Sequence, residues 1–465
     1  MIKKEFLIAA FIALSACTLG DNYRQPEFYD NTQLAKELRL NGANIKLPDK
    51  WYKRFKDNKL QAILEKGLKN SPNVQTAVAR LRAARAELAI SRSEYLPQIN
   101  FQGGYNYEKS SRNIKMAEDS HYYNAGFDAS WEIDIWGAGR RQNEAYKAQL
   151  KAQEYNLANV KTVLAAEIIT LYVKWCESIE NLHLARQNAA FQRDLLKTAE
   201  SKYYSGLTDE QSYNEAAYLL NDTEAQIPVN TLAAEEYKNA LAVAAGVLPS
   251  ELDLSESYKS PLFSGHYKDE SAGLHNLPAT VIRLRPDVSA AEQLLISQNA
   301  LVGKAVAELY PDVSISGLFG FASQGGSSLL SAKSKTYNYA PVVSLPLLDW
   351  NRLQNQIKLQ KYKTEESLVA YKTAVLQAVS ELKNSMAGYK SALQQFNRYG
   401  AAVNNMKKAS DSVNRKYQNG LTEFSEVLKA QQNLLSAQKS YISSKAAINT
   451  ALAAYYKATG APIDN

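Results

Sequence analysis

The chain has 465 residues, of which 45% are hydrophobic and 22% are charged, and its formal net charge is +7 at pH 7. Because this charge is mild for the length and no block of like charges occurs, the sequence lacks the electrostatic footprint of a nucleic-acid-binding protein. Its four histidines (His121, His183, His266 and His275) do not stand at metal-ligand spacing, and it has no phosphate-binding glycine loop or nucleophile elbow. We therefore expect no catalysis, no bound metal and no cofactor.

The first residues have the pattern of an export signal. Two lysines precede a short apolar run at 6–14, which ends in Leu14-Ser15-Ala16-Cys17. This end resembles the lipobox of bacterial lipoproteins, in which the signal (1–16) is removed and the cysteine becomes the lipidated first residue. An ordinary signal peptide that carries a cysteine is the alternative. Thr18 rather than aspartate follows Cys17, which by the same resemblance permits sorting to the outer membrane.

Beyond the signal, no run of 18 apolar residues occurs, so no transmembrane helix is expected. A lipid-anchored, exported chain of this kind could cross a bilayer only as β-strands.

The chain repeats itself at a fixed offset of 214 positions. The phrase KYYSGLT at 202–208 returns as KYQNGLT at 416–422. Four further anchors share the offset: Pro72 with Pro286, Pro97 with Pro311, Trp136 with Trp350, and Gly246 with Gly460. We infer a duplicated unit at 58–250 and 272–465, preceded by an N-terminal segment at 17–57 and joined by a linker at 251–271.

Both units follow one plan, in which a moderate helix and a β-hairpin are followed by a very long helix, a tip and a return helix. The predicted ranges are 74–93, 98–135, 140–205 and 205–209 in the first unit, and 288–309, 312–347, 352–419 and 419–423 in the second. A helix of such length would reach about 100 Å at 1.5 Å per residue. It therefore indicates a coiled tube or bundle rather than a compact globule.

Each repeated phrase marks the tip of a helical hairpin. Gly206 and Gly420 suit the left-handed conformation that ends a helix. Thr208 and Thr422 are predicted to cap the helices that follow, and Thr208 forms a capping box with Gln211. A proline at 228 in the first return helix is expected to kink or break it.

The hairpins alternate apolar and polar residues over about ten positions, which is the pattern of strands in a membrane barrel. Asp128, Glu132 and Asp134 fall on the polar face of the first hairpin and are predicted to face a lumen. A soluble sandwich shows the same alternation and is the alternative for this stretch taken alone. Four strands cannot close a barrel, and an open edge is not tolerated in lipid. Copies must therefore pool strands, and the polar inner face favours a trimer with twelve.

Several motifs resemble those of TolC-family outer membrane factors, of the lipoprotein kind used by tripartite efflux systems. They are Cys17-Thr18-Leu19-Gly20-Asp21-Asn22-Tyr23-Arg24-Gln25-Pro26, Trp51-Tyr52-Lys53-Arg54-Phe55, Trp131-Glu132-Ile133-Asp134-Ile135-Trp136-Gly137, Arg285-Pro286-Asp287-Val288 and the two tips. The resemblance runs from about residue 17 to 463.

This resemblance implies a mainly α fold with a β portion: a homotrimer with a twelve-stranded barrel in the outer membrane and a helical tube in the periplasm. It implies an equatorial belt at 30–58, 250–275 and the C-terminus. It also implies that the tips, Gly206-Leu207-Thr208 and Gly420-Leu421-Thr422, meet a periplasmic adaptor driven by an inner-membrane pump. The expected function is export of small toxic compounds, with a protein-secretion duct, or a lipid-anchored coiled-coil scaffold, as alternatives.

One position departs from the family pattern. Relatives often carry an aspartate about nine residues after the second tip glycine, where this chain has Lys429. The matching position in the first unit is Glu215. We expect these two residues to face each other near the closed end of the tube, with Glu426 nearby, as a candidate gate; two unrelated solvated charges are the alternative.

Overall fold

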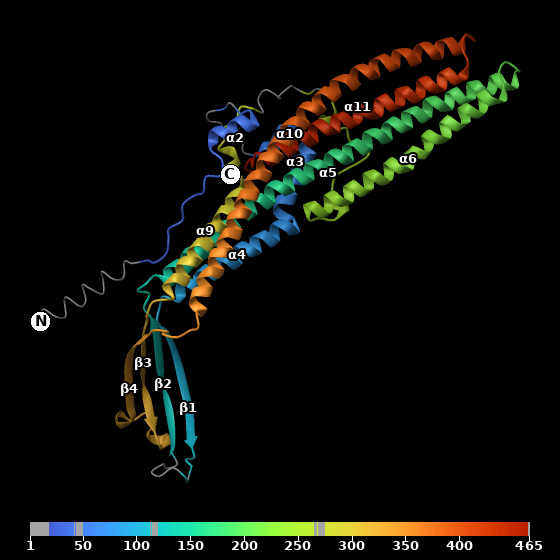
Figure 1. The fold of residues 1–465 in the computed structure, drawn as a ribbon. Helices are drawn as coiled ribbons and strands as arrows, with labels where there is room; N and C mark the ends of the chain where they lie inside the picture. The colour runs from blue at the N-terminus through green and yellow to red at the C-terminus, as the bar shows by residue number, and fades with distance from the viewer. Residues whose placement is uncertain are drawn as a thin grey trace. The chain divides into compact units, whose positions relative to one another are not determined.

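The computed structural model describes residues 18–40, 42, 50–111, 113, 120–264, 267 and 275–463. They divide into two compact units, each assembled from separate stretches of the chain. The first comprises the residues up to Pro26, Arg80–Glu154 and Ala290–Lys372, and the second comprises Glu27–Ala79, Tyr155–Ser289 and Thr373 onwards. Four helices contribute residues to both units: α4 (Pro72–Ser93), α5 (Ala138–Tyr204), α9 (Pro286–Ala307) and α10 (Arg352–Gln418) (Figure 1).

The first unit contains a single antiparallel sheet. Its strands are β1 (Gln98–Glu108), β2 (Ser120–Glu132), β3 (Asp312–Ser323) and β4 (Lys335–Ser344), paired in the order β1-β2-β3-β4. The two predicted hairpins therefore exist, and they join through β2 and β3. Two short turns, η4 (Gly326–Ser328) and η5 (Ala332–Ser334), lie in the loop between β3 and β4.

The strand register separates the two faces of the sheet. Phe101 pairs with Phe127, and Phe127 pairs in turn with Phe319. One position along, Asn100 pairs with Asp128 on the opposite face. Because a strand alternates its side chains between faces, this register gathers the aromatic residues on one side and the amides and carboxylates on the other. All eleven residues of β1 are exposed in the single chain, so both faces of this strand are accessible to solvent, lipid or another copy.

The long helices match their predicted extents closely. Helices α5 and α10 have 67 residues each and are uninterrupted. The return helices are α6 (Glu210–Ala245) and α11 (Phe424–Ala458). Helix α6 continues through Pro228, so the predicted break does not occur. Near that proline, Asn230 and Thr231 donate side-chain hydrogen bonds to the carbonyls of Gln226 and Ile227.

No helix in the described part of the chain is both long enough and apolar enough to cross a membrane.

The second unit also contains short elements and a buried carboxylate, Asp57. The short elements are α2 (Asn31–Leu38), η1 (Trp51–Phe55), α3 (Asn58–Asn70), η2 (Pro249–Glu251), η3 (Pro261–Phe263) and α8 (Val281–Leu284). Asp57 is fully buried and caps α3 through the backbone amides of Lys59 and Leu60. It also accepts bonds from the hydroxyls of Tyr172 (2.9 Å), Tyr258 (2.9 Å) and Ser260 (2.6 Å). Five donors thus satisfy one buried acid, and Asp57 links Tyr258 and Ser260 to Tyr172 on α5.

Candidate functional site

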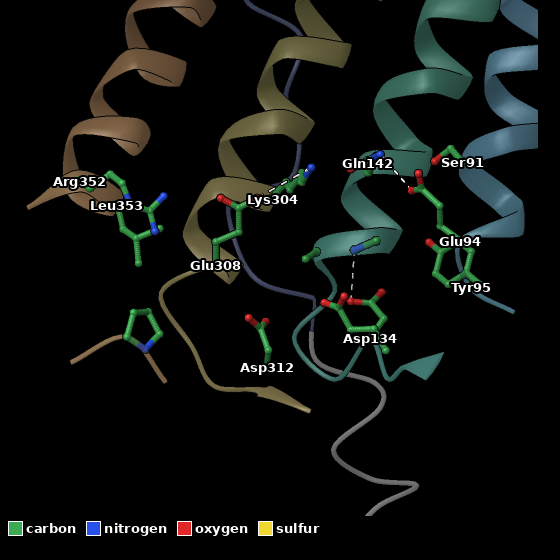
Figure 2. Close-up of a pocket in the computed structure, with 14 residues that line it drawn as sticks. Ser91, Glu94, Tyr95, Asp134, Gln142, Lys304, Glu308, Asp312, Arg352 and Leu353 are labelled. Atoms are coloured by element: carbon green, nitrogen blue, oxygen red, sulfur yellow. Dashed lines mark hydrogen bonds and ion pairs between the residues drawn. The ribbon is translucent and has the colours of Figure 1, made fainter. Parts of the chain in front are cut away.

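A cavity of about 530 Å³ lies in the first unit, where the sheet meets the helix ends (Figure 2). Five carboxylates line it, against two cationic side chains, Lys304 and Arg352. The five are Glu94, Glu132, Asp134, Glu308 and Asp312. Lys304 pairs with Glu308 at 3.8 Å, and Gln142 donates to Glu94 at 3.1 Å. The surface is therefore acidic overall and suits contact with water or cations rather than with lipid.

Asp134 does not lie on the strand where it was predicted. Strand β2 ends at Glu132, and Asp134 lies in the connection to α5. Its carboxylate accepts bonds from the backbone amides of Gly139 (3.2 Å) and Arg140 (2.9 Å) and pairs with the Arg140 side chain at 3.2 Å. The first turn of a helix presents unpaired amides and a positive dipole end, which together explain why an acid is placed there.

Two cavity residues escaped the sequence analysis although a signal for them was present. Glu94 and Glu308 stand 214 positions apart, within motifs that both repeats carry before their prolines. Pairing of duplicated acids therefore pointed to a shared acidic surface. Asp312 gave no comparable signal, since its repeat partner is Gln98.

Asp128 lies on the polar face of the sheet, as predicted. It accepts bonds from Asn100 at 3.2 Å and Gln102 at 2.6 Å, both on β1. Asn106 donates to Asn124 in the same way at 2.9 Å. The polar face thus carries a network of amides and carboxylates across β1 and β2. That this face lines a lumen stays a prediction.

The two tips have the predicted glycine turns. Gly206 has φ +69° and Gly420 has φ +72°. In the first tip the Leu207 amide donates to the Lys202 carbonyl, and in the second the Leu421 amide donates to the Lys416 carbonyl. These bonds close the helix ends. Leu207 is 77% exposed and Leu421 is 74% exposed at the two tips.

The capping residues differ from those expected. Asp209, not Thr208, caps α6 by accepting from the Ser212 amide at 3.0 Å. This bond holds the pKa of Asp209 below its usual value. Glu423, not Thr422, stands at the start of α11 and makes no side-chain capping bond. The turns extend one residue further than the sequence pattern suggested.

The two hairpins of one chain pack on each other behind the tips. A buried cluster joins all four helices there: Leu195, Ala199, Ala216, Tyr417, Phe424 and Val427. Lys202 crosses from the first hairpin to the second, donating to the Tyr417 carbonyl at 2.9 Å, and its ammonium lies 4.0 Å from the centre of the Tyr417 ring.

Glu215 and Lys429 make no ion pair within the described chain. Glu215 accepts instead from Gln211 at 2.9 Å, and Lys429 is exposed, as is Glu426. That the two residues face each other near the closed end of the tube stays a prediction. Cys17 lies outside the described residues, and among those that are described no group of three or more His, Cys, Asp or Glu residues could hold a metal ion.

The family model for "Outer membrane efflux protein" matches the chain twice, at residues 63–247 and 277–461. The chain belongs to the outer membrane efflux protein family. Both ends of the two matches differ by the same 214 positions that separate the repeated motifs. The duplication inferred from the sequence is therefore a property of the family fold, and the resemblance to TolC-type factors is confirmed.

Curated relatives of this outer membrane efflux protein are similar over nearly their whole length. The solvent efflux pump outer membrane protein SrpC of Pseudomonas putida is 25% identical and matches over 98% of each chain. The pyoverdine export outer membrane protein OpmQ of Pseudomonas aeruginosa is 26% identical, over 99% of this chain and 97% of that one. The cation efflux system protein CusC of Escherichia coli is 23% identical, over 93% and 92%.

Solved channels confirm the fold. The outer-membrane channel OprN superposes with a TM-score of 0.86 at 25% identity, covering 96% of this chain and 99% of that one. The Campylobacter jejuni CmeC outer membrane channel gives 0.87 at 24% identity, covering 96% of each. The mainly α fold with a β-barrel portion, expected from the sequence, is the fold of these channels.

Proposed function

We propose that three copies of this outer membrane efflux protein form one exit duct, with a twelve-stranded barrel in the outer membrane and a helical tube in the periplasm. The observation that carries the proposal is the sheet itself. Its outer strands β1 and β4 are each paired on one side only within the described chain. A sheet with open edges is not stable in hydrocarbon, whereas three such sheets joined edge to edge leave none.

The exposed side chains support the same assembly. Phe101, Phe127 and Phe319 share the face that the register makes apolar, and each is more than half exposed in one chain. On the helices, Leu232, Val243 and Tyr362 are at least 60% exposed. We assign the apolar sheet face to lipid and the apolar helix positions to contacts between copies.

The tips would meet a periplasmic adaptor, and an inner-membrane pump would supply the energy. Leu207 and Leu421 offer exposed apolar contacts for that partner. The cargo class that we propose is small toxic compounds, because the relatives named above are components of solvent, cation and pyoverdine export systems. We further propose that Cys17 carries the palmitate-containing lipid anchor.

The experiment is purification of the full-length protein from outer membranes, followed by semi-native electrophoresis and planar-bilayer recording. We expect a heat-resistant trimer that conducts ions only as a trimer. A single copy that conducts by itself, or a soluble elongated dimer, would overturn the proposal. Replacing Phe127 by Asp should prevent insertion, because it places a charge on the lipid face. Replacing the adjacent Asp128 by Asn should allow insertion and lower cation selectivity.

Gating by Lys429 is tested on the same channels. If Lys429 and Glu215 pair between copies, Lys429→Ala should raise the open probability, and Glu215→Gln should do the same. A surface pair contributes at most about 1 kcal/mol, so roughly a fivefold rise is expected. An unchanged open probability in both variants would show that neither residue constricts the duct.

A further inference from the structure

Residues 18–22, which follow Cys17, contact the start of α5. The Leu19 amide donates to the Trp136 carbonyl at 3.2 Å. Arg141 in return donates to the carbonyls of Leu19 (2.9 Å) and Gly20 (2.7 Å) and to the side chain of Asn22 (3.1 Å). Its guanidinium thus binds three acceptors within residues 19–22, all in the first unit.

Arg141 is built into this position. Its side chain is only 2% exposed, and its remaining nitrogen donates to Glu144 at 2.8 Å. A planar guanidinium with several directed donors recognises fixed acceptors more specifically than an ammonium does. Asn299 on α9 adds a bond to the Asp21 carbonyl at 3.0 Å. Most of these bonds reach main-chain oxygens, so Arg141 and Asn299 bind the backbone of residues 19–21.

Glycines in the segment and in the chain around it make these close contacts possible. A Cβ on Gly20, whose φ is +84°, would lie 2.5 Å from the Cα of Gly303. A Cβ on Gly137, whose φ is also +84°, would lie 3.0 Å from the Cα of Thr18, and one on Gly303 would lie 2.8 Å from the Arg141 Nε. The segment therefore approaches α9 and the start of α5 closer than any other residue would allow.

The second repeat lacks the residues that bind this segment. The positions that match Gly137, Arg141 and Gly303 at the offset of 214 are Asn351, Asn355 and Ala89. The adjacent Trp350 is 85% exposed, whereas its mate Trp136 is partly covered and donates to the Pro311 carbonyl at 2.8 Å. A chain has one N-terminus to hold, and only one repeat carries the residues that hold it.

Several aromatic residues lie at this end of the sheet, and one of them, Trp136, contacts the segment through its carbonyl. The rings of Trp136 and Tyr310 lie 4.9 Å apart, and Trp131 donates to the Tyr95 carbonyl at 2.8 Å. Trp and Tyr concentrate at the boundary between hydrocarbon and water in membrane barrels. The residue bonded to Cys17 is therefore held at the depth where acyl chains begin.

We propose that Gly137, Arg141 and Gly303 form a receptor for residues 18–22, which ties the lipid on Cys17 to the sheet of its own chain. This inference rests on the proposed lipidation of Cys17. The lipid then acts on the sheet end directly and keeps the strands beside the bilayer while the barrel assembles. Without the receptor, the anchor would tether the chain but would not orient the sheet.

The test uses the full-length protein in outer membranes, with two readouts. The first is amide hydrogen exchange of residues 18–22, and the second is the yield of heat-resistant trimer. Arg141→Ala should speed exchange of these residues at least tenfold and lower the trimer yield to that of Cys17→Ser. Because both changes interrupt one connection, the double variant should lose no more than either single variant. Asn355→Ala, the matched position of the second repeat, should change neither readout.

Gly20→Ala is the second variant, because it alters the held segment and leaves the receptor intact. It should reproduce both effects of Arg141→Ala, so a folding defect of the Arg141 variant cannot mask the result. Slow exchange of residues 18–22 that survives both substitutions would overturn the proposal. So would trimer losses of Arg141→Ala and Cys17→Ser that multiply in the double variant. Incorporation of labelled palmitate is measured in parallel: its absence would refute the lipidation alone, whereas the exchange readout still decides whether the receptor exists.

Discussion

The two hairpin tips share seven-residue phrases that differ at only two positions, yet their aromatic residues are buried to different extents. In the second tip, Tyr417 is 4% exposed and Phe424 is 1% exposed, and both belong to the buried cluster. In the first tip, Tyr203 remains partly exposed and stacks on Tyr213, and the position that matches Phe424 is the exposed Glu210. The shared phrase specifies the turn in both tips, whereas Phe424, two residues after the second phrase, is a core residue that has no buried counterpart in the first tip.

Phe424→Ala should strongly destabilise the second tip. Truncating a fully buried phenylalanine costs about 3–5 kcal/mol through lost burial and the cavity left behind. We expect amide exchange in the last turns of α10 and the first turns of α11 to rise by more than a hundredfold. Glu210→Ala at the matched position should leave exchange in the first hairpin unchanged. Equal effects at the two positions would show that the tips are equivalent.

The glycines should behave alike in both tips. A Cβ at Gly206 or Gly420 would meet no atom within 4 Å, so alanine there costs only the strain of a left-handed backbone. That strain is about 1–2 kcal/mol. Local exchange at each tip should therefore rise roughly tenfold in Gly206→Ala and in Gly420→Ala. A much larger rise at one tip alone would indicate a packing role there.

A substitution at Lys202 should change amide exchange at the second tip by a smaller factor. Lys202→Met removes the bond to the Tyr417 carbonyl and the contact with its ring, which together are worth about 0.5–1 kcal/mol at a partly exposed site. Exchange at Tyr417 should rise about two- to fivefold. Lys416→Met is the matched control, and no change is expected because Lys416 makes no such contact in the described chain. A similar rise in both variants would exclude a bridge specific to Lys202.

The smallest effect concerns the start of α6 and its pH dependence. Because the pKa of Asp209 is lowered in the folded chain, its carboxylate stabilises this helix start above the ordinary pKa of 3.8, and the contribution is lost as the pH falls below that value. Exchange rates corrected for pH should rise there on acidification, and Asp209→Asn should remove part of that pH dependence. The start of α11, where Glu423 makes no capping bond, is the internal control. A pH response of equal size at both helix starts would contradict the assignment.

Local patterns predicted the four strands, the long helices and the glycine turns, because each depends on residues close together in the sequence. The duplication was predictable because matching motifs recur at one fixed offset. Contacts between residues far apart in the sequence could not be predicted. Nothing near Asp57 signals that hydroxyls more than a hundred positions away converge on it, and nothing near Arg141 signals that it holds residues 19 and 20. Asp134 was misplaced for a related reason, since the alternating pattern continues past the strand end into a helix cap.

The bond from Lys202 to the Tyr417 carbonyl has a mechanical consequence. Together with the buried cluster behind the tips, it couples the two hairpins of one copy, so force applied to either tip is shared by both. If three copies line the opening of the duct and that opening widens, the interfaces between copies should separate first. The opening should then enlarge equally at all three interfaces. An adaptor would need to pull on only one hairpin of each copy.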